Sequence, residues 1–131
     1  MKKLLLLSLL IVSPALADME KAYQAEQDGD YEIAYGEFMT EAETGNTEAM
    51  VMIGLYYARG FHVKEDANKS NEWMLKAANL GDATAALNMG VGYQRGFGDL
   101  TKDETIALEW FLSAAKKGQA QAQFETAVAY Q

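Results

Sequence analysis

The sequence lacks, or nearly lacks, three residue types whose presence would point to particular structures or reactions. Its 131 residues include no cysteine, one histidine and one proline. Without cysteine, the chain forms neither disulfides nor thiolate metal sites. A histidine-based zinc site or a Ser-His-Asp triad would depend on His62 alone. The single proline is Pro14, so no later residue interrupts a helix in the way that proline does.

The N-terminal residues have the pattern of an export signal. Two lysines precede an apolar run over residues 4–12, and Ala15-Leu16-Ala17 is a small-x-small cleavage site. The apolar run is too short for a spanning helix. We therefore expect residues 1–17 to be a signal peptide, cleaved between Ala17 and Asp18. The mature protein, residues 18–131, is then expected to be periplasmic or secreted, without stable membrane insertion. An uncleaved N-terminal anchor is the alternative.

Basic residues are scarce in the expected mature chain. Without Lys2 and Lys3, 9 basic residues face 19 acidic ones, a net charge of −10. The excess is concentrated at residues 18–48, with 10 acids and one base, whereas residues 49–131 are nearly balanced. Such a field repels nucleic acid and anionic membranes and favours a partner with a basic surface. The alternative is that a polar first repeat simply keeps a repeat protein soluble.

The strongest positive signal is an internal repeat of 36 to 37 residues. Five positions recur at fixed spacing: an alanine, an apolar residue, a glycine, a tyrosine and a second glycine. They are Ala49, Ile53, Gly54, Tyr57 and Gly60 in one copy, and Ala85, Met89, Gly90, Tyr93 and Gly96 in the next. Each copy continues with an aspartate, a Glu-Trp pair, two alanines and a glycine. A period in the 30s is typical of helical repeat arrays. The sequence therefore predicts an all-α fold, a short αα-solenoid of about three helix pairs plus a C-terminal half-unit.

The period divides the mature chain into units of about 18–46, 47–82, 83–118 and a half-unit 119–131. Helices are expected over residues 19–28, 31–44, 47–59 and 67–79, with the third unit repeating the second. Asp66 is placed to cap one helix, and Thr101 with Glu104 fits a capping box, although Asp103 competes with it. Asp99 is one extra residue in the third unit.

Within the second unit, Ala49, Ile53 and Tyr57 share one helix face and are expected to point inward. Gly54 beside them suggests a close approach between helices. Trp73 and Trp110 also lie on an apolar stripe and are expected to pack in the core rather than to stack on a ligand.

The binding surface is expected on the inner helices, because solenoids bind along the surface that these helices line. We predict that it includes the residues pointing away from the core, which are Met52, Tyr56, Arg59, Asn88 and Arg95. Aromatic and arginine residues are the usual interface anchors. The alternative is that these residues are ordinary surface.

The second and third units resemble the Sel1-like repeat, a relative of the tetratricopeptide repeat. The resemblance covers roughly residues 22–131, and the unit before Gly45 looks like a degenerate first repeat. This sequence departs from the pattern at His62, where glycine is usual, at Ser70, where alanine is usual, and at Ile106 and Ser113, which replace lysines. The motif residues of the family are structural, so the resemblance implies no catalytic residue, no metal and no cofactor.

The resemblance implies an adaptor-like protein. Family members scaffold degradation complexes, tune envelope signalling, engage host proteins or act as periplasmic immunity proteins against type VI secretion lipases. A cysteine-rich branch is linked to penicillin binding, but it relies on disulfides that this chain lacks. We therefore expect a non-enzymatic periplasmic protein–protein interaction module, with an immunity protein as one version. An envelope adaptor or regulator is the alternative, and an enzyme acting on cell wall or β-lactams is the third possibility.

Overall fold

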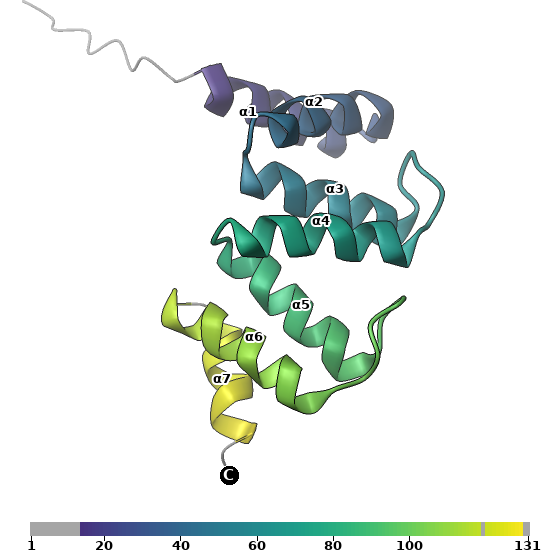
Figure 1. Cartoon of the computed structure of the whole chain (residues 1–131). Coiled ribbons are helices and arrows are strands. Elements are labelled where there is room, and N and C mark those ends of the chain that lie inside the picture. The colour runs from purple at the N-terminus through teal and green to yellow at the C-terminus, as the bar shows by residue number, and fades with distance from the viewer. Residues whose placement is uncertain (1–13, 119, 130–131) are drawn as a thin grey trace, which may run out of the picture.

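The computed structural model describes the backbone of residues 14–118 and 120–129, which form helices and their connections without any strand. The helices are α1 (Pro14–Gln27), α2 (Tyr31–Glu43), α3 (Thr47–Arg59), α4 (Ala67–Asn79), α5 (Ala83–Arg95), α6 (Glu104–Lys116) and α7 (Ala120–Ala129). Each helix packs mainly on those before and after it in the chain. Figure 1 shows the resulting stack, with α1 at one end and α7 at the other. The all-α solenoid expected from the repeat is confirmed.

Most of the expected signal peptide, residues 1–13, lies outside the described residues, so its removal remains a prediction. Helix α1 begins at Pro14, ahead of the expected cleavage site. Leu16 is 62% exposed, whereas Met19 is 5% exposed and belongs to the core. None of the described helices is both long and apolar enough to cross a membrane.

Aspartate and asparagine side chains set where the helices start. Asp30, Asn46, Asp66 and Asp82 each accept a hydrogen bond from the backbone N–H three residues later. Asp103 does the same for α6, accepting from Ile106 N at 3.0 Å. Of the two caps expected to compete for α6, Asp103 is therefore confirmed, and the Thr101 capping box is wrong because Thr101 lies outside the helix.

The core runs along the stack between successive helices. Its largest fully buried side chains are Phe38, Met50, Ile53, Tyr56 and Met89, and both tryptophans are partly buried against the core. The close approach expected at Gly54 is confirmed: a Cβ built there would lie 3.0 Å from Met74 Cε. At the equivalent Gly90 it would lie 2.5 Å from Phe111 Cε1. Small residues thus let the two helices of a unit pack closely.

Tyr56 points the opposite way from the expectation. It is 1% exposed, with its ring near those of Phe38, Phe61 and Tyr31, whereas Tyr57 is only partly buried. The reason is helical geometry. At about 100° per residue, a residue seven positions after Ala49 returns to within about 20° of it, while one eight positions later is about 80° away. Tyr56, and not Tyr57, therefore continues the Ala49 face.

Candidate interaction groove

A hollow of about 410 Å³ crosses α1, α3 and α5 on the layer of odd-numbered helices. We call it the inner groove. Its lining residues are Tyr23 from α1, Glu48, Val51, Met52 and Leu55 from α3, and Asp82 and Thr84 at the start of α5. A protein segment could therefore contact three helices at once.

The apolar floor of the inner groove follows from helical spacing. Val51 and Leu55 are one turn apart on α3, with Met52 beside them. The same register positions are apolar in later units, as Leu87 and Val91 in α5 and as Phe124 and Val128 in α7. Phe124 and Val128 are 65% and 50% exposed. The repeat thus places an apolar pair next to the core stripe in each of these helices.

The rim of the inner groove is acidic. The Tyr23 hydroxyl donates a hydrogen bond to Glu48 Oε1 at 2.5 Å. Burial first, and then this bond to Glu48, raises the pKa of Tyr23 well above its usual range, so the phenol stays a donor at neutral pH. Asp82 accepts from Thr47 Oγ1 at 2.9 Å as well as capping α5. In the part of the chain that the structure describes, no lysine or arginine lines the groove, so its field favours a cationic group.

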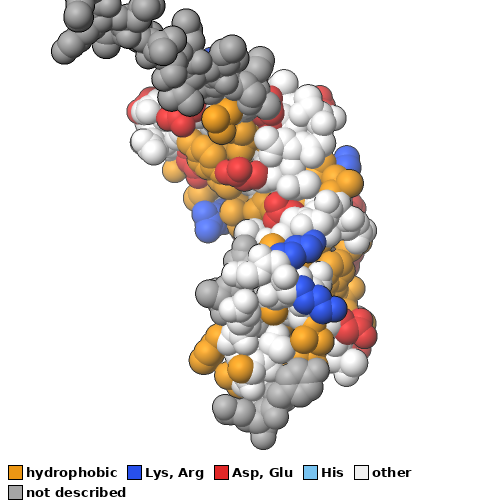
Figure 2. All heavy atoms as spheres, turned by 90° about the vertical axis from the view of Figure 1, so that its left-hand side faces the viewer, with side chains coloured by type: hydrophobic (Ala, Val, Ile, Leu, Met, Phe, Trp, Pro, Cys, Tyr) orange, Lys and Arg blue, Asp and Glu red, His pale blue; other side chains and the backbone are white. Residues whose placement is uncertain are grey.

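Figure 2 views the side of the stack on which α3 and α5 begin. Over the N-terminal helices, in the upper half of this view, hydrophobic side chains are exposed between acidic ones. Lysine and arginine side chains lie at the edges of this region and lower on the same face. Exposed hydrophobic and acidic side chains thus lie next to one another over the N-terminal helices.

Of the five residues predicted for partner binding, only Met52 lines the inner groove. Asn88 is half-buried, and its Nδ2 donates to Thr84 O at 3.0 Å, one turn away. Arg59 and Arg95 are exposed in the last turns of α3 and α5, at the other end of these helices. Arg59 Cζ lies 5.9 Å from the centre of the Phe61 ring. Tyr56 is in the core. Partner contact by the four other residues remains a prediction.

The residues that sequence reasoning missed are the acidic and apolar side chains of the groove. Glu48 and Asp82 resemble ordinary helix-start residues, and nothing local indicates that they share a rim. The apolar pair was detectable, because Val51 and Leu55 recur as Leu87 and Val91 outside the expected inward stripe. A second apolar stripe in each repeat is the signal that would have identified the floor.

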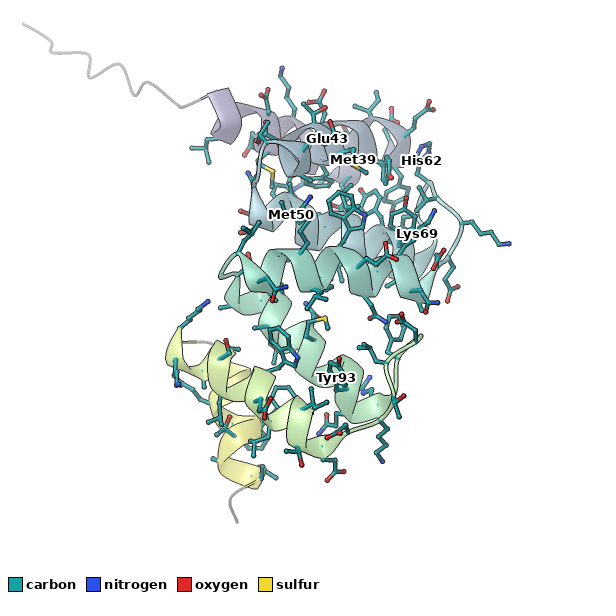
Figure 3. The ribbon with its side chains drawn as sticks, in the orientation of Figure 1. Met39, Glu43, Met50, His62, Lys69 and Tyr93 are labelled. Atoms are coloured by element: carbon teal, nitrogen blue, oxygen red, sulfur yellow. The ribbon has the colours of Figure 1, made fainter. Side chains whose placement is uncertain are left out.

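His62 occupies the glycine-like position expected from the repeat. Its backbone φ is 59°, in the left-handed region that favours glycine. Its ring centre lies 5.3 Å from that of Tyr35, and Figure 3 shows the side chain beside α2. Among the described residues, no three histidine, aspartate or glutamate side chains gather in a way that could hold a metal ion.

Comparison with known proteins identifies the family. The Sel1 repeat model matches residues 47–82 and 83–119, more than half of the chain. The chain therefore belongs to the Sel1 repeat family. Sel1 repeat proteins are protein–protein interaction modules, and their fold is typically a non-enzymatic scaffold.

Three relatives show how far the similarity extends. The chain is 38% identical over 76 residues to the ERAD-associated E3 ubiquitin-protein ligase component HRD3A of Arabidopsis thaliana, covering 57% of this chain and 11% of the plant protein. A Sel1 repeat protein from Oxalobacter formigenes has a TM-score of 0.77 and 31% identity, over 82% of this chain and 44% of its own. The protein c5321, a protective antigen present in uropathogenic Escherichia coli strains, has a TM-score of 0.73 and 26% identity, over 82% of this chain and 24% of its own. The chain spans less than half of each relative.

Proposed function

We propose that the inner groove binds a protein partner whose surface presents a basic residue next to an apolar side chain. The observation that supports this proposal is the groove itself. Its apolar floor is formed by Val51, Met52 and Leu55, and the carboxylates of Glu48 and Asp82 lie at its rim. Apolar burial supplies affinity, and the acidic rim supplies orientation and a faster encounter. The function is thus that of a non-enzymatic interaction module.

The finer proposal is a periplasmic immunity protein that neutralises a type VI secretion effector. It is supported by the export pattern at residues 1–17 and by the acidic surplus of the N-terminal half, which suits tight binding of a basic toxin. An envelope adaptor with a resident partner is the alternative. The two proposals differ in the partner that is recovered and in its affinity. An immunity protein has to bind its toxin tightly, because the toxin is present at low concentration.

The test is capture of partners from envelope extract and exported effectors on immobilised protein, comparing wild type with Met52→Lys and Glu48→Lys. Both changes alter the inner groove without replacing a fully buried side chain. We expect one stoichiometric partner, retained at moderate salt by wild type and lost from both variants. Rising salt should weaken its binding, because the rim carboxylates are exposed to screening.

Glu72→Lys is the matched control, because Glu72 is an exposed carboxylate on α4 that undergoes the same charge reversal outside the groove. It should retain the partner. A partner held equally by all four proteins would contradict the proposed surface, and recovery of no partner would contradict the interaction role. A captured toxin would select immunity, and a resident envelope protein would select the adaptor.

A further inference from the structure

The loops after α3 and α5 pack back on the start of the even-numbered helix one unit earlier. After α3, the Phe61 ring stacks on Tyr31 with 4.8 Å between ring centres, and His62 lies over Tyr35. Both tyrosines are in the first turns of α2. In Figure 1 these loops are on the right-hand side of the stack.

The loop after α5 repeats this arrangement on α4. Asn71 Nδ2 donates to Phe97 O at 3.0 Å and to Asp99 Oδ1 at 2.9 Å. The loop also covers Gly92 of α5, where an added Cβ would lie 2.9 Å from Leu100 Cδ1. The extra residue of the third unit, Asp99, therefore belongs to a loop contact between two units.

The corresponding place in α7 is not covered by any of the described residues. Tyr56, Gly92 and Ala129 occupy the same place in α3, α5 and α7, 36 and 37 residues apart. Tyr56 fills the space with its own ring and Leu100 covers Gly92, whereas Ala129 is exposed. A groove of about 210 Å³ lies there, and we call it the terminal groove. Its principal lining residues are Glu104, Leu108 and Phe111 of α6 and Glu125, Val128 and Ala129 of α7.

We propose that the terminal groove binds a surface loop of a partner protein that presents a leucine or aromatic side chain next to a lysine or arginine. The apolar requirement follows from Leu100, which covers Gly92, and from the Tyr56 ring, which fills the equivalent place in α3. Leu108 replaces Asn71 in the register, so this floor is more apolar than that on α4. The basic requirement follows from Glu104 and Glu125, because no cationic side chain among the described residues lines the groove. The terminal groove is separate from the inner groove.

The probe is a phage library of six-residue loops whose ends are held apart as those of residues 60–65 are in this chain. Loops are selected by their binding to the full chain. We expect enriched loops to combine an apolar or aromatic residue with a basic one. Leu108→Lys should weaken their binding by about tenfold or more, since it places a charge on the apolar floor. Leu75→Lys is the matched control, because Leu75 is a 40% exposed leucine on α4 and should leave binding unchanged.

Val128→Lys provides a second variant if circular dichroism shows that Leu108→Lys alters the fold. Met52→Lys should not affect loop binding, which separates this site from the proposed function. Three results would overturn the assignment: no enriched loop, enriched loops without the apolar–basic pair, or binding that survives both groove variants. Concentration-dependent dimerisation that Leu108→Lys abolishes would assign the groove to a second copy and would also overturn it.

Discussion

At the scale of single residues, the structure separates positions that look alike in the sequence. Gly90 and Gly54 are equivalent in the repeat, yet their partners differ in stiffness. An added methyl group at Gly90 meets the Phe111 ring, whereas at Gly54 it meets the flexible end of Met74. Gly36 lies on α2 with nothing within 4 Å of an added Cβ. The three glycines therefore predict three different responses to alanine.

Gly90→Ala should lower the free energy of unfolding by about 1–3 kcal/mol, because overpacking outweighs the better helix propensity of alanine. Gly54→Ala should cost less, since Met74 can move. Gly36→Ala is the control and should raise stability by roughly 0.5–1 kcal/mol. Urea denaturation of the three variants checks the order. Equal effects at positions 90 and 36 would contradict the close packing of α5 and α6.

Tyr56 gives the fold a dependence on alkaline pH. Burial raises the pKa of Tyr56 to about 12, and its hydroxyl has no hydrogen-bond partner. The unfolded chain loses this proton near pH 10, before the folded one does, so the stabilisation is complete below about pH 10 and is lost as pH rises toward 12. The partly buried Tyr23 and Tyr35, whose pKa values are also raised, act in the same direction.

Tyr56→Phe should therefore flatten part of the fall in Tm between about pH 10 and 12. At pH 7 it should leave stability unchanged or raise it by up to about 1 kcal/mol, because the removed hydroxyl is unpaired. Wild type, measured alongside at each pH, is the reference for this slope. Thermal unfolding followed by circular dichroism at several pH values measures both. An unchanged slope for Tyr56→Phe would contradict the assignment.

At the scale of elements, the starts of α2 to α6 depend on a short polar side chain rather than on the first apolar residue. Asp66 and Asp103 cap α4 and α6 in the same way, with 3.0 Å between the carboxylate oxygen and the backbone nitrogen in both. Asp103→Ala should cost about 1 kcal/mol of unfolding free energy. Thr101→Ala, two residues outside the helix, should change it by less than about 0.5 kcal/mol. Chemical denaturation distinguishes the two, and a larger effect at Thr101 would restore the capping box.

Helices α3 to α6 were predictable because the pattern that indicates them occurs twice in the sequence. The bounds of α3 and α4 match the sequence prediction at both ends. Helical geometry also decides which of two adjacent tyrosines enters the core, because at 100° per residue Tyr56, and not Tyr57, returns to the Ala49 face. The groove rim was not predictable, because Glu48 and Asp82 are brought together only by the packing of α3 against its neighbours.

At the scale of the whole molecule, stability in a solenoid is the sum of unit and neighbour terms, so position along the stack matters. Helices α3 to α5 have neighbours on both sides, whereas α7 packs mainly on α6 and exposes Phe124 and Val128. Native-state hydrogen exchange should therefore give the lowest opening free energies in α7 and the highest in α3 to α5.

The same experiment tests whether the exposed α7 end of the stack is covered by another molecule in solution. If α7 exchanges as slowly as α4, the end is protected in solution, and repeating the measurement at lower protein concentration shows whether a second copy is responsible. Phe124→Ser serves as the control, because the side chain is 65% exposed and its loss should leave exchange in α3 to α5 unchanged. Slowed exchange in α7 on addition of a loop selected on the terminal groove would place the bound loop at this end, since a ligand that binds only the closed helix lowers its opening.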